Sequence, residues 1–137
     1  MPHNHRQRWA AKESLRFPPV EFKDRQIDLI CDGFQTACDQ SKYRVFACAV
    51  MASHVHMVIG HHATRIRRII GHFKGNATLA IKRSQSENTF RGPIWSEHGW
   101  NVYLDTEEDV ERAIRYVEDN PVKEGRAVQR WEFVSPL

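Results

Sequence analysis

The sequence of 137 residues contains no apolar run long enough to cross a membrane, no internal repeat and no low-complexity tract. Its cysteines are few and odd in number, and they lack the spacing of a zinc knuckle. The amino-terminal stretch, residues 1–9, is charged and has no apolar segment typical of a secretory signal. We therefore expect a soluble cytoplasmic protein without a membrane partner, in which Cys31, Cys38 and Cys48 are buried thiols without chemistry.

Length and composition favour one domain with a proper core, because 41% of the residues are hydrophobic. We expect a flexible basic amino terminus over residues 1–12 and a single domain over residues 13–137. Apolar residues at helical spacing predict a first helix; they are Ile27, Ile30, Phe34, Ala37 and Cys38. Trp95, Trp100 and Tyr103 alternate with polar residues around a predicted strand, and they are either core residues or platforms on which bases stack.

The net charge of +3 says little, but acidic residues are absent between positions 65 and 86. Basic residues there accompany an apolar stripe at helical spacing; the basic residues are Arg65, Arg67, Arg68, Lys74, Lys82 and Arg83. The pattern predicts a core-packed helix with a basic outer face. Such a face could contact DNA phosphates in a salt-dependent way, although an ordinary solvated surface has the same pattern.

The run from Arg44 to Ile59 predicts two β-strands joined at Ala52-Ser53. Within it, His54 and His56 are two positions apart, so they share one face of a strand while Val55 turns into the core. This geometry offers two imidazoles to one metal ion. The alternative is two half-buried histidines at a sheet edge.

The segment after Thr106 predicts a helix, with Thr106 as N-cap and Asp109 three residues later. Its core-facing stripe consists of Val110, Ala113, Ile114 and Val117. Because Pro121 disfavours helical geometry at Asn120, we expect the helix to end there.

Tyr116 and Asn120 lie four residues apart on one flank of that stripe, where a phenol and a carboxamide could reach a neighbouring strand together. A packed tyrosine followed by an asparagine helix stop is the alternative. Glu118 and Asp119 point elsewhere around the helix, so we expect them to be solvated rather than catalytic.

Taken together, these segments resemble the REP-associated tyrosine transposases, which are single-tyrosine HUH (His-hydrophobic-His) transposases. The resemblance rests on the strand phrase from Val50 to Val58 and on the Tyr-x-x-x-Asn-Pro-Val run from Tyr116, which a basic residue and a glycine follow. It also takes in Lys74 to Thr78 and Trp95 to Asp105, and so covers roughly residues 13 to 134.

The resemblance implies a metal-dependent endonuclease and transposase that cleaves and rejoins hairpin-associated single-stranded DNA through a 5′-phosphotyrosine intermediate. It assigns the metal to His54, His56 and Asn120, and the nucleophile to Tyr116. Two imidazoles and one amide oxygen leave positions on a divalent ion, Mg²⁺ or Mn²⁺, for phosphate oxygens and water. The partner would be single-stranded DNA with hairpin structure, bound by a monomer or a homodimer.

The element order of helix, hairpin, helix, strand and helix predicts an α+β fold. The resemblance implies a ferredoxin-like antiparallel sheet with the helices packed on one face. One departure is that members of the family begin with a strand, whereas the stretch from Arg6 to Phe17 is charged and weakly patterned. Either a degenerate first strand lies there, or the sheet lacks that strand and exposes an edge. A truncated copy that has lost activity is a further alternative.

Two other functions remain open from the sequence. A domesticated non-cleaving binder of repeat hairpin DNA would keep the fold and the basic helix but would form no covalent tyrosine adduct. A structural zinc protein would bind metal through His54 and His56 with His61, His62 or His72, and chelators would unfold it.

Overall fold

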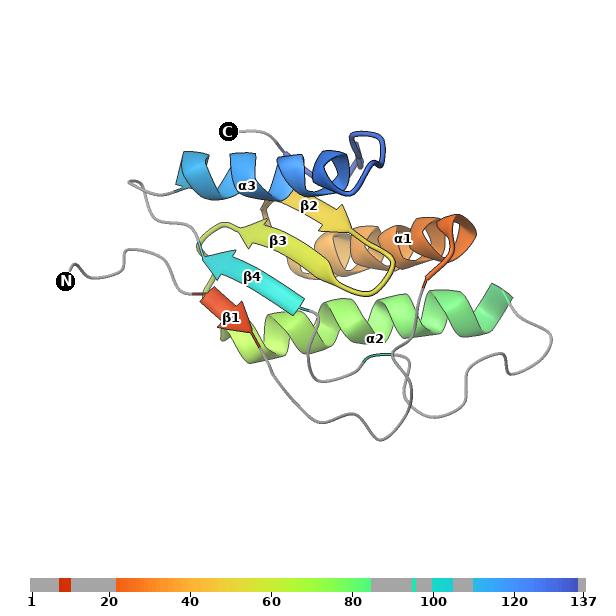
Figure 1. Ribbon diagram of the computed structural model, residues 1–137. Coiled ribbons are helices and arrows are strands. Elements are labelled where there is room, and N and C mark those ends of the chain that lie inside the picture. The colour runs from red at the N-terminus through yellow and green to blue at the C-terminus, as the bar shows by residue number, and fades with distance from the viewer. Residues whose placement is uncertain (1–7, 11–21, 85–94, 96–99, 105–109, 136–137) are drawn as a thin grey trace.

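The computed structural model describes residues 8–10, 22–84, 95, 100–104 and 110–135. The elements in chain order are β1 (Arg8–Ala10), α1 (Asp24–Ser41), β2 (Val45–Val50), β3 (Val55–Ile59), α2 (Ile66–Ser84), β4 (Trp100–Leu104) and α3 (Val110–Lys123). The four strands form one sheet in the order β1-β4-β3-β2 (Figure 1). The predicted α+β class is confirmed, and the first six elements have the βαββαβ order of ferredoxin-like folds.

The sheet is mixed, so the prediction of a purely antiparallel sheet is wrong in one pair. Strands β2 and β3 form the predicted antiparallel hairpin, in which Ala49 pairs with His56. Strands β3 and β4 are parallel, and Val55 pairs with Trp100. The reason is the connection between them, because a long crossover that contains a helix returns the chain in the same direction.

A degenerate first strand is present, so the alternative of a sheet without it is wrong. Strand β1 is only three residues long and pairs antiparallel with β4 at the edge of the sheet, where Trp9 lies opposite Val102. This strand falls inside the segment 1–12 that we expected to be flexible. The domain boundary after residue 12 stays a prediction.

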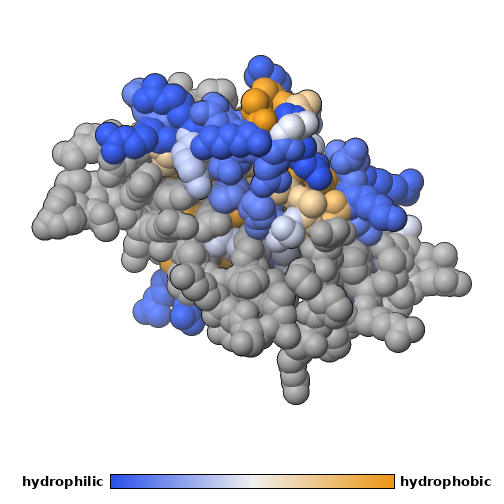
Figure 2. All heavy atoms as spheres, in the orientation of Figure 1, coloured by the Kyte–Doolittle hydropathy of each residue, from blue (hydrophilic) through white to orange (hydrophobic). Residues whose placement is uncertain are grey.

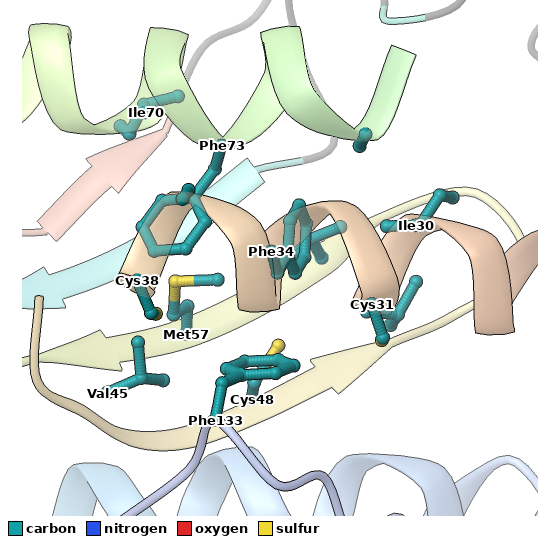
Figure 3. Packing of buried hydrophobic residues seen from close by; sticks show 14 of the residues in the cluster. Ile30, Cys31, Phe34, Cys38, Val45, Cys48, Met57, Ile70, Phe73 and Phe133 are labelled. Carbon is teal, nitrogen blue, oxygen red and sulfur yellow. The ribbon is translucent and has the colours of Figure 1, made fainter. Parts of the chain in front are cut away.

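Helices α1 and α2 cover one face of the sheet. Their apolar stripes meet alternate residues of β2 and β3, among them Val45 and Met57, in the larger of two buried clusters. Figure 3 shows Phe34 of α1 and Phe73 of α2 within this cluster. The helices approach closely at Gly33, where an added Cβ would lie 2.6 Å from the Ala77 backbone. All five apolar residues predicted for the first helix are buried.

Helix α3 covers the opposite face, so the prediction that the helices share one face is wrong. Val110, Ala113 and Val117 pack against Phe46, Ala49 and Val58, which form part of a second, smaller cluster. The reason lies in the pleat of the sheet, because residues that alternate with the first set point to the other side. The residues of β2 that point to this side are also apolar, so a second helix has to shield them from water.

Helix α3 does not end at Asn120 as predicted; it continues to Lys123 with Pro121 inside its last turn. The turn closes with a hydrogen bond from the Arg126 N–H to the Pro121 carbonyl oxygen (2.7 Å) and a left-handed Gly125 (φ 76°). This Schellman arrangement satisfies terminal carbonyl groups beyond the proline. The predicted N-cap, Thr106, and Asp109 lie outside the described residues.

The cysteines are buried and free, as predicted. Burial raises the pKa of the Cys38 thiol to about 12 and raises the pKa values of Cys31 and Cys48 well above their usual range. Trp100 is also buried in the larger cluster, and the partly buried Trp95 packs against that cluster, which favours a core role for these two aromatic residues. Within the described part of the chain, no helix has the length and apolar character needed to cross a membrane.

Candidate active site

The two histidines of the strand motif lie at the start of β3. His54 directly precedes the strand and His56 is its second residue, and their rings are 4.8 Å apart and almost perpendicular. Val55 between them is fully buried in the cluster beneath α1 and α2, as the alternation predicts. His56 is only 6% exposed, so the sheet and α3 hold its ring in place. The two imidazoles are therefore brought together as the sequence predicts.

Tyr116 comes to this pair from α3. Its ring centre lies 6.0 Å from that of His56, although the two residues are sixty positions apart in the sequence. The tyrosine is 42% exposed, which excludes the alternative of a packed core tyrosine. The Lys123 ammonium lies 5.1 Å from the Tyr116 ring centre, in a cation–π contact. The phenol is thus held beside a buried imidazole while still open to a large ligand.

Asn120 follows Tyr116 by one helical turn. Its Nδ2 donates a hydrogen bond to the Tyr116 carbonyl oxygen (2.8 Å), so the amide oxygen Oδ1 is the atom of this side chain that can act as an acceptor or a ligand. The helix continues past this residue, so its role as a helix stop is excluded. Glu118 and Asp119 are exposed, as expected for solvated positions.

Glu124 is a candidate that the sequence reasoning missed. Its carboxylate Oε2 lies 3.7 Å from Nε2 of His54. The sequence contained a signal for it, because Tyr116, Asn120 and Glu124 are spaced by four residues and form one polar stripe along α3 and the residue that follows it. This stripe touches His56 at one end and His54 at the other. Asn120 lies between those two contacts on the same side of the helix.

The spacing of the two imidazoles suits one divalent ion. Nδ1 of His54 lies 3.2 Å from the Ser53 hydroxyl, which leaves Nε2 as the nitrogen available to a ligand. Two imidazoles that bind one ion through nitrogens at about 2.1 Å have ring centres roughly 4.5–5.5 Å apart. The observed 4.8 Å lies within that range. A set of imidazole nitrogens, an amide oxygen and water molecules suits ions such as Mn²⁺. It also suits Mg²⁺ where oxygen atoms make up most of the ligands.

The basic residues of the predicted DNA-binding face lie far from this site in the fold. Most are exposed on or just before α2; they are Arg65, Arg67, Arg68, Lys82 and Arg83. Lys74 is half-buried, and its ammonium lies 5.5 Å from the Trp100 ring centre. Because α2 and α3 cover opposite faces, the sheet separates these cations from Tyr116. The outer surface of α3, at the top of Figure 2, is itself largely hydrophilic.

The structure does not assemble the zinc site that the sequence left open. His61 follows the far end of β3, and a strand of five residues separates it from His54 by about 16 Å. His62 bonds the Ser41 carbonyl oxygen and His72 bonds the Gln40 side chain, both near the carboxyl end of α1. Among the described residues, no three His, Cys, Asp or Glu side chains are placed to hold one ion.

Comparison with protein families matches the chain over residues 21–120 to the family described as "Transposase IS200 like". The match spans 100 of the 137 residues and includes His54, His56, Tyr116 and Asn120. No curated protein and no solved structure matches the chain.

Proposed function

The chain belongs to the IS200-like transposase family, and on this premise we propose that it cleaves and rejoins single-stranded DNA at hairpins, with Tyr116 as the nucleophile. The family is one of DNA transposases, which are generally metal-dependent nucleases. The observation that best supports the specific proposal is the approach of the Tyr116 ring to His56, from a different element and sixty positions away. A nucleophile and a metal-ligand pair thereby share one site.

The proposed step is a transesterification. The Tyr116 phenolic oxygen attacks the phosphorus, a Tyr–O–P bond forms, and the bond from phosphorus to the 3′-oxygen breaks. The phenolic proton passes through water to the departing 3′-oxygen, which leaves a 5′-phosphotyrosine and a free 3′-hydroxyl. One phosphoester replaces another, so the reverse attack by a 3′-hydroxyl rejoins DNA without a nucleotide energy source.

The residues of the chain divide this task. His54, His56 and Asn120 would hold a divalent ion, which when bound polarises the scissile phosphate. Burial of His56 fixes one ligand, and its pairing with Ala49 anchors the strand that carries it. A free phenol is almost entirely protonated at neutral pH, so Tyr116 depends on its surroundings for activation. The amide of Asn120 supports the Tyr116 backbone directly.

The basic surface of α2, defined as Arg65, Arg67, Arg68, Lys82 and Arg83, would bind DNA away from the point of cleavage. A phosphate held there cannot be the one beside Tyr116, because the sheet lies between α2 and α3. We assign this surface, with Lys74 at its edge, to a different part of the same DNA. Phosphate contacts of this kind carry little sequence preference and weaken steeply with salt.

The test is covalent adduct formation with end-labelled hairpin oligonucleotides in the presence of Mn²⁺ or Mg²⁺, read on a denaturing gel. Wild type should form a metal-dependent adduct, and Tyr116→Phe should form none while keeping the same melting temperature. Tyr43→Phe is the matched control, because Tyr43 is buried in the cluster on the other face and should leave the adduct intact. Binding without any adduct across a varied hairpin panel would contradict cleavage and support the non-cleaving binder.

A further inference from the structure

We propose that Glu124 is a fourth protein ligand of the metal site, which binds the ion directly or through one water molecule. The inference rests on the proposed function, since it assumes that His54, His56 and Asn120 hold a divalent ion. It adds a carboxylate to a site whose other protein donors are neutral.

The distance between the Glu124 carboxylate and His54 supports a shared ion. Two atoms that bind the same ion at about 2.1 Å, with an angle of 90° to 120° between them, are roughly 3.0 to 3.7 Å apart. Oε2 of Glu124 lies 3.7 Å from Nε2 of His54, the nitrogen that its neighbour Ser53 leaves available. This separation is long for a hydrogen bond but suits two ligands of a shared ion.

The position of Glu124 at the end of the helix also supports this role. Glu124 is two helical turns after Tyr116 and one turn after Asn120, so the three side chains line one side of the end of α3. The Schellman turn fixes the backbone at this point, because the Glu124 N–H donates to the Asn120 and Pro121 carbonyl oxygens (3.3 and 3.1 Å). The backbone is therefore fixed while the side chain, 46% exposed, can still change rotamer.

The Glu124 carboxylate would also supply a negative charge that the other protein donors lack. Two neutral imidazoles and an amide give no negative charge to a divalent ion, and the number of charged ligands is a main determinant of affinity for such ions. One carboxylate would raise that affinity and still leave a net positive site for a DNA phosphate. In the structure Glu124 does not form a three-ligand group with His54 and His56, so its partly exposed side chain would have to turn toward the ion when the ion binds.

The experiment is Mn²⁺ titration of the full-length, DNA-free protein by calorimetry, with Glu124→Gln compared with wild type. Glutamine keeps the size of the side chain and removes its charge, so we expect the dissociation constant for Mn²⁺ to rise about tenfold or more. Glu118→Gln is the matched control on the same helix and should bind Mn²⁺ like wild type. Melting temperatures of all variants would show that each is folded.

Two further outcomes separate the inference from the proposed function. If His56→Ala loses Mn²⁺ binding while Glu124→Gln binds like wild type, the metal site stands and Glu124 is only an ion-pair partner of His54. If wild type binds no Mn²⁺, or His56→Ala binds it equally well, the proposed metal site fails and the role of Glu124 fails with it.

Discussion

The two faces of the sheet are built from different kinds of residue. The face beneath α1 and α2 buries large aromatic side chains, such as Phe34, Phe73 and Trp100. The face beneath α3 buries mainly alanine and valine, and it carries His56, the one buried polar side chain found among the described residues. The first face therefore supplies most of the apolar burial, whereas the second brings a helix close to the sheet and places a phenol beside imidazoles.

Strand β3 contributes both to the core on one face and to the candidate active site on the other. Val55 and Met57 point into the aromatic cluster, while His56 between them points to the α3 side. Tight packing of the first face thus fixes the position of His56, the proposed metal ligand, on the second. Substitutions beneath α1 and α2 should therefore mainly lower the free energy of unfolding, whereas substitutions beneath α3 should mainly lower adduct formation.

The largest effect on stability is expected from Phe34→Ala. Phe34 is fully buried, and its ring contacts those of Phe73, Trp100 and Phe133 at centre distances of 5.2 to 5.9 Å. Loss of the ring should lower the free energy of unfolding in urea by about 3–5 kcal/mol. Leu79→Ala, at a position 49% exposed, is the control and should change it by less than about 0.5 kcal/mol. A similarly small effect of Phe34→Ala would contradict the assignment of stability to this face.

Ala113→Leu should lower the free energy of unfolding by less than Phe34→Ala and should reduce adduct formation by more. Ala113 is 1% exposed between α3 and the sheet, so three added carbon atoms have no space and should push the helix outward. The cost of such overpacking is about 1–3 kcal/mol in the free energy of unfolding. Because Tyr116 lies one turn further along, adduct formation should fall as well. Glu118→Leu, at an exposed site on the same helix, should leave stability unchanged; adduct formation unaffected by Ala113→Leu would show that close packing of α3 is not needed.

The smallest effect on stability is expected from the double substitution Arg67→Ala and Arg68→Ala. Both side chains are exposed at the start of α2, so the free energy of unfolding should change by less than about 0.5 kcal/mol per site. The slope of log binding constant against log salt concentration should become less negative by about 1 to 2, as for the loss of two phosphate contacts. Cleavage at saturating DNA should stay the same. A loss of cleavage at saturation with an unchanged salt slope would instead connect this surface to the active site.

Much of this arrangement could be predicted from the sequence. Apolar spacing located the helices, and alternation around Val55 gave the shared face of His54 and His56, because both depend on local periodicity. The sequence left strand β1 as one of two alternatives, since three residues carry no clear pattern and form a strand only through pairing with β4. The sequence did contain a signal for the position of α3 on the other face, and it was missed. The continuous apolar run Val45–Val50 is typical of a strand that is covered on both faces.

The end of α3 was mispredicted for a different reason. Pro121 only disfavours a helical residue before it, and the hydrogen bonds that close the turn at Gly125 outweigh that preference. The contact of Glu124 with His54 depends on this extra turn of helix. It could not be found while the helix was expected to end at Asn120.

The most direct test of Tyr116 as the nucleophile is to locate the DNA-linked residue in the covalent adduct by mass spectrometry. The sequence has three tyrosines, Tyr43, Tyr103 and Tyr116, and cleavage by trypsin after Arg115 and Lys123 isolates the last of these in one short peptide. After nuclease digestion, we expect a residual nucleotide on the peptide Tyr116–Lys123. A nucleotide on a peptide that contains Tyr43 or Tyr103, or on no tyrosine, would contradict the role assigned to the α3 face.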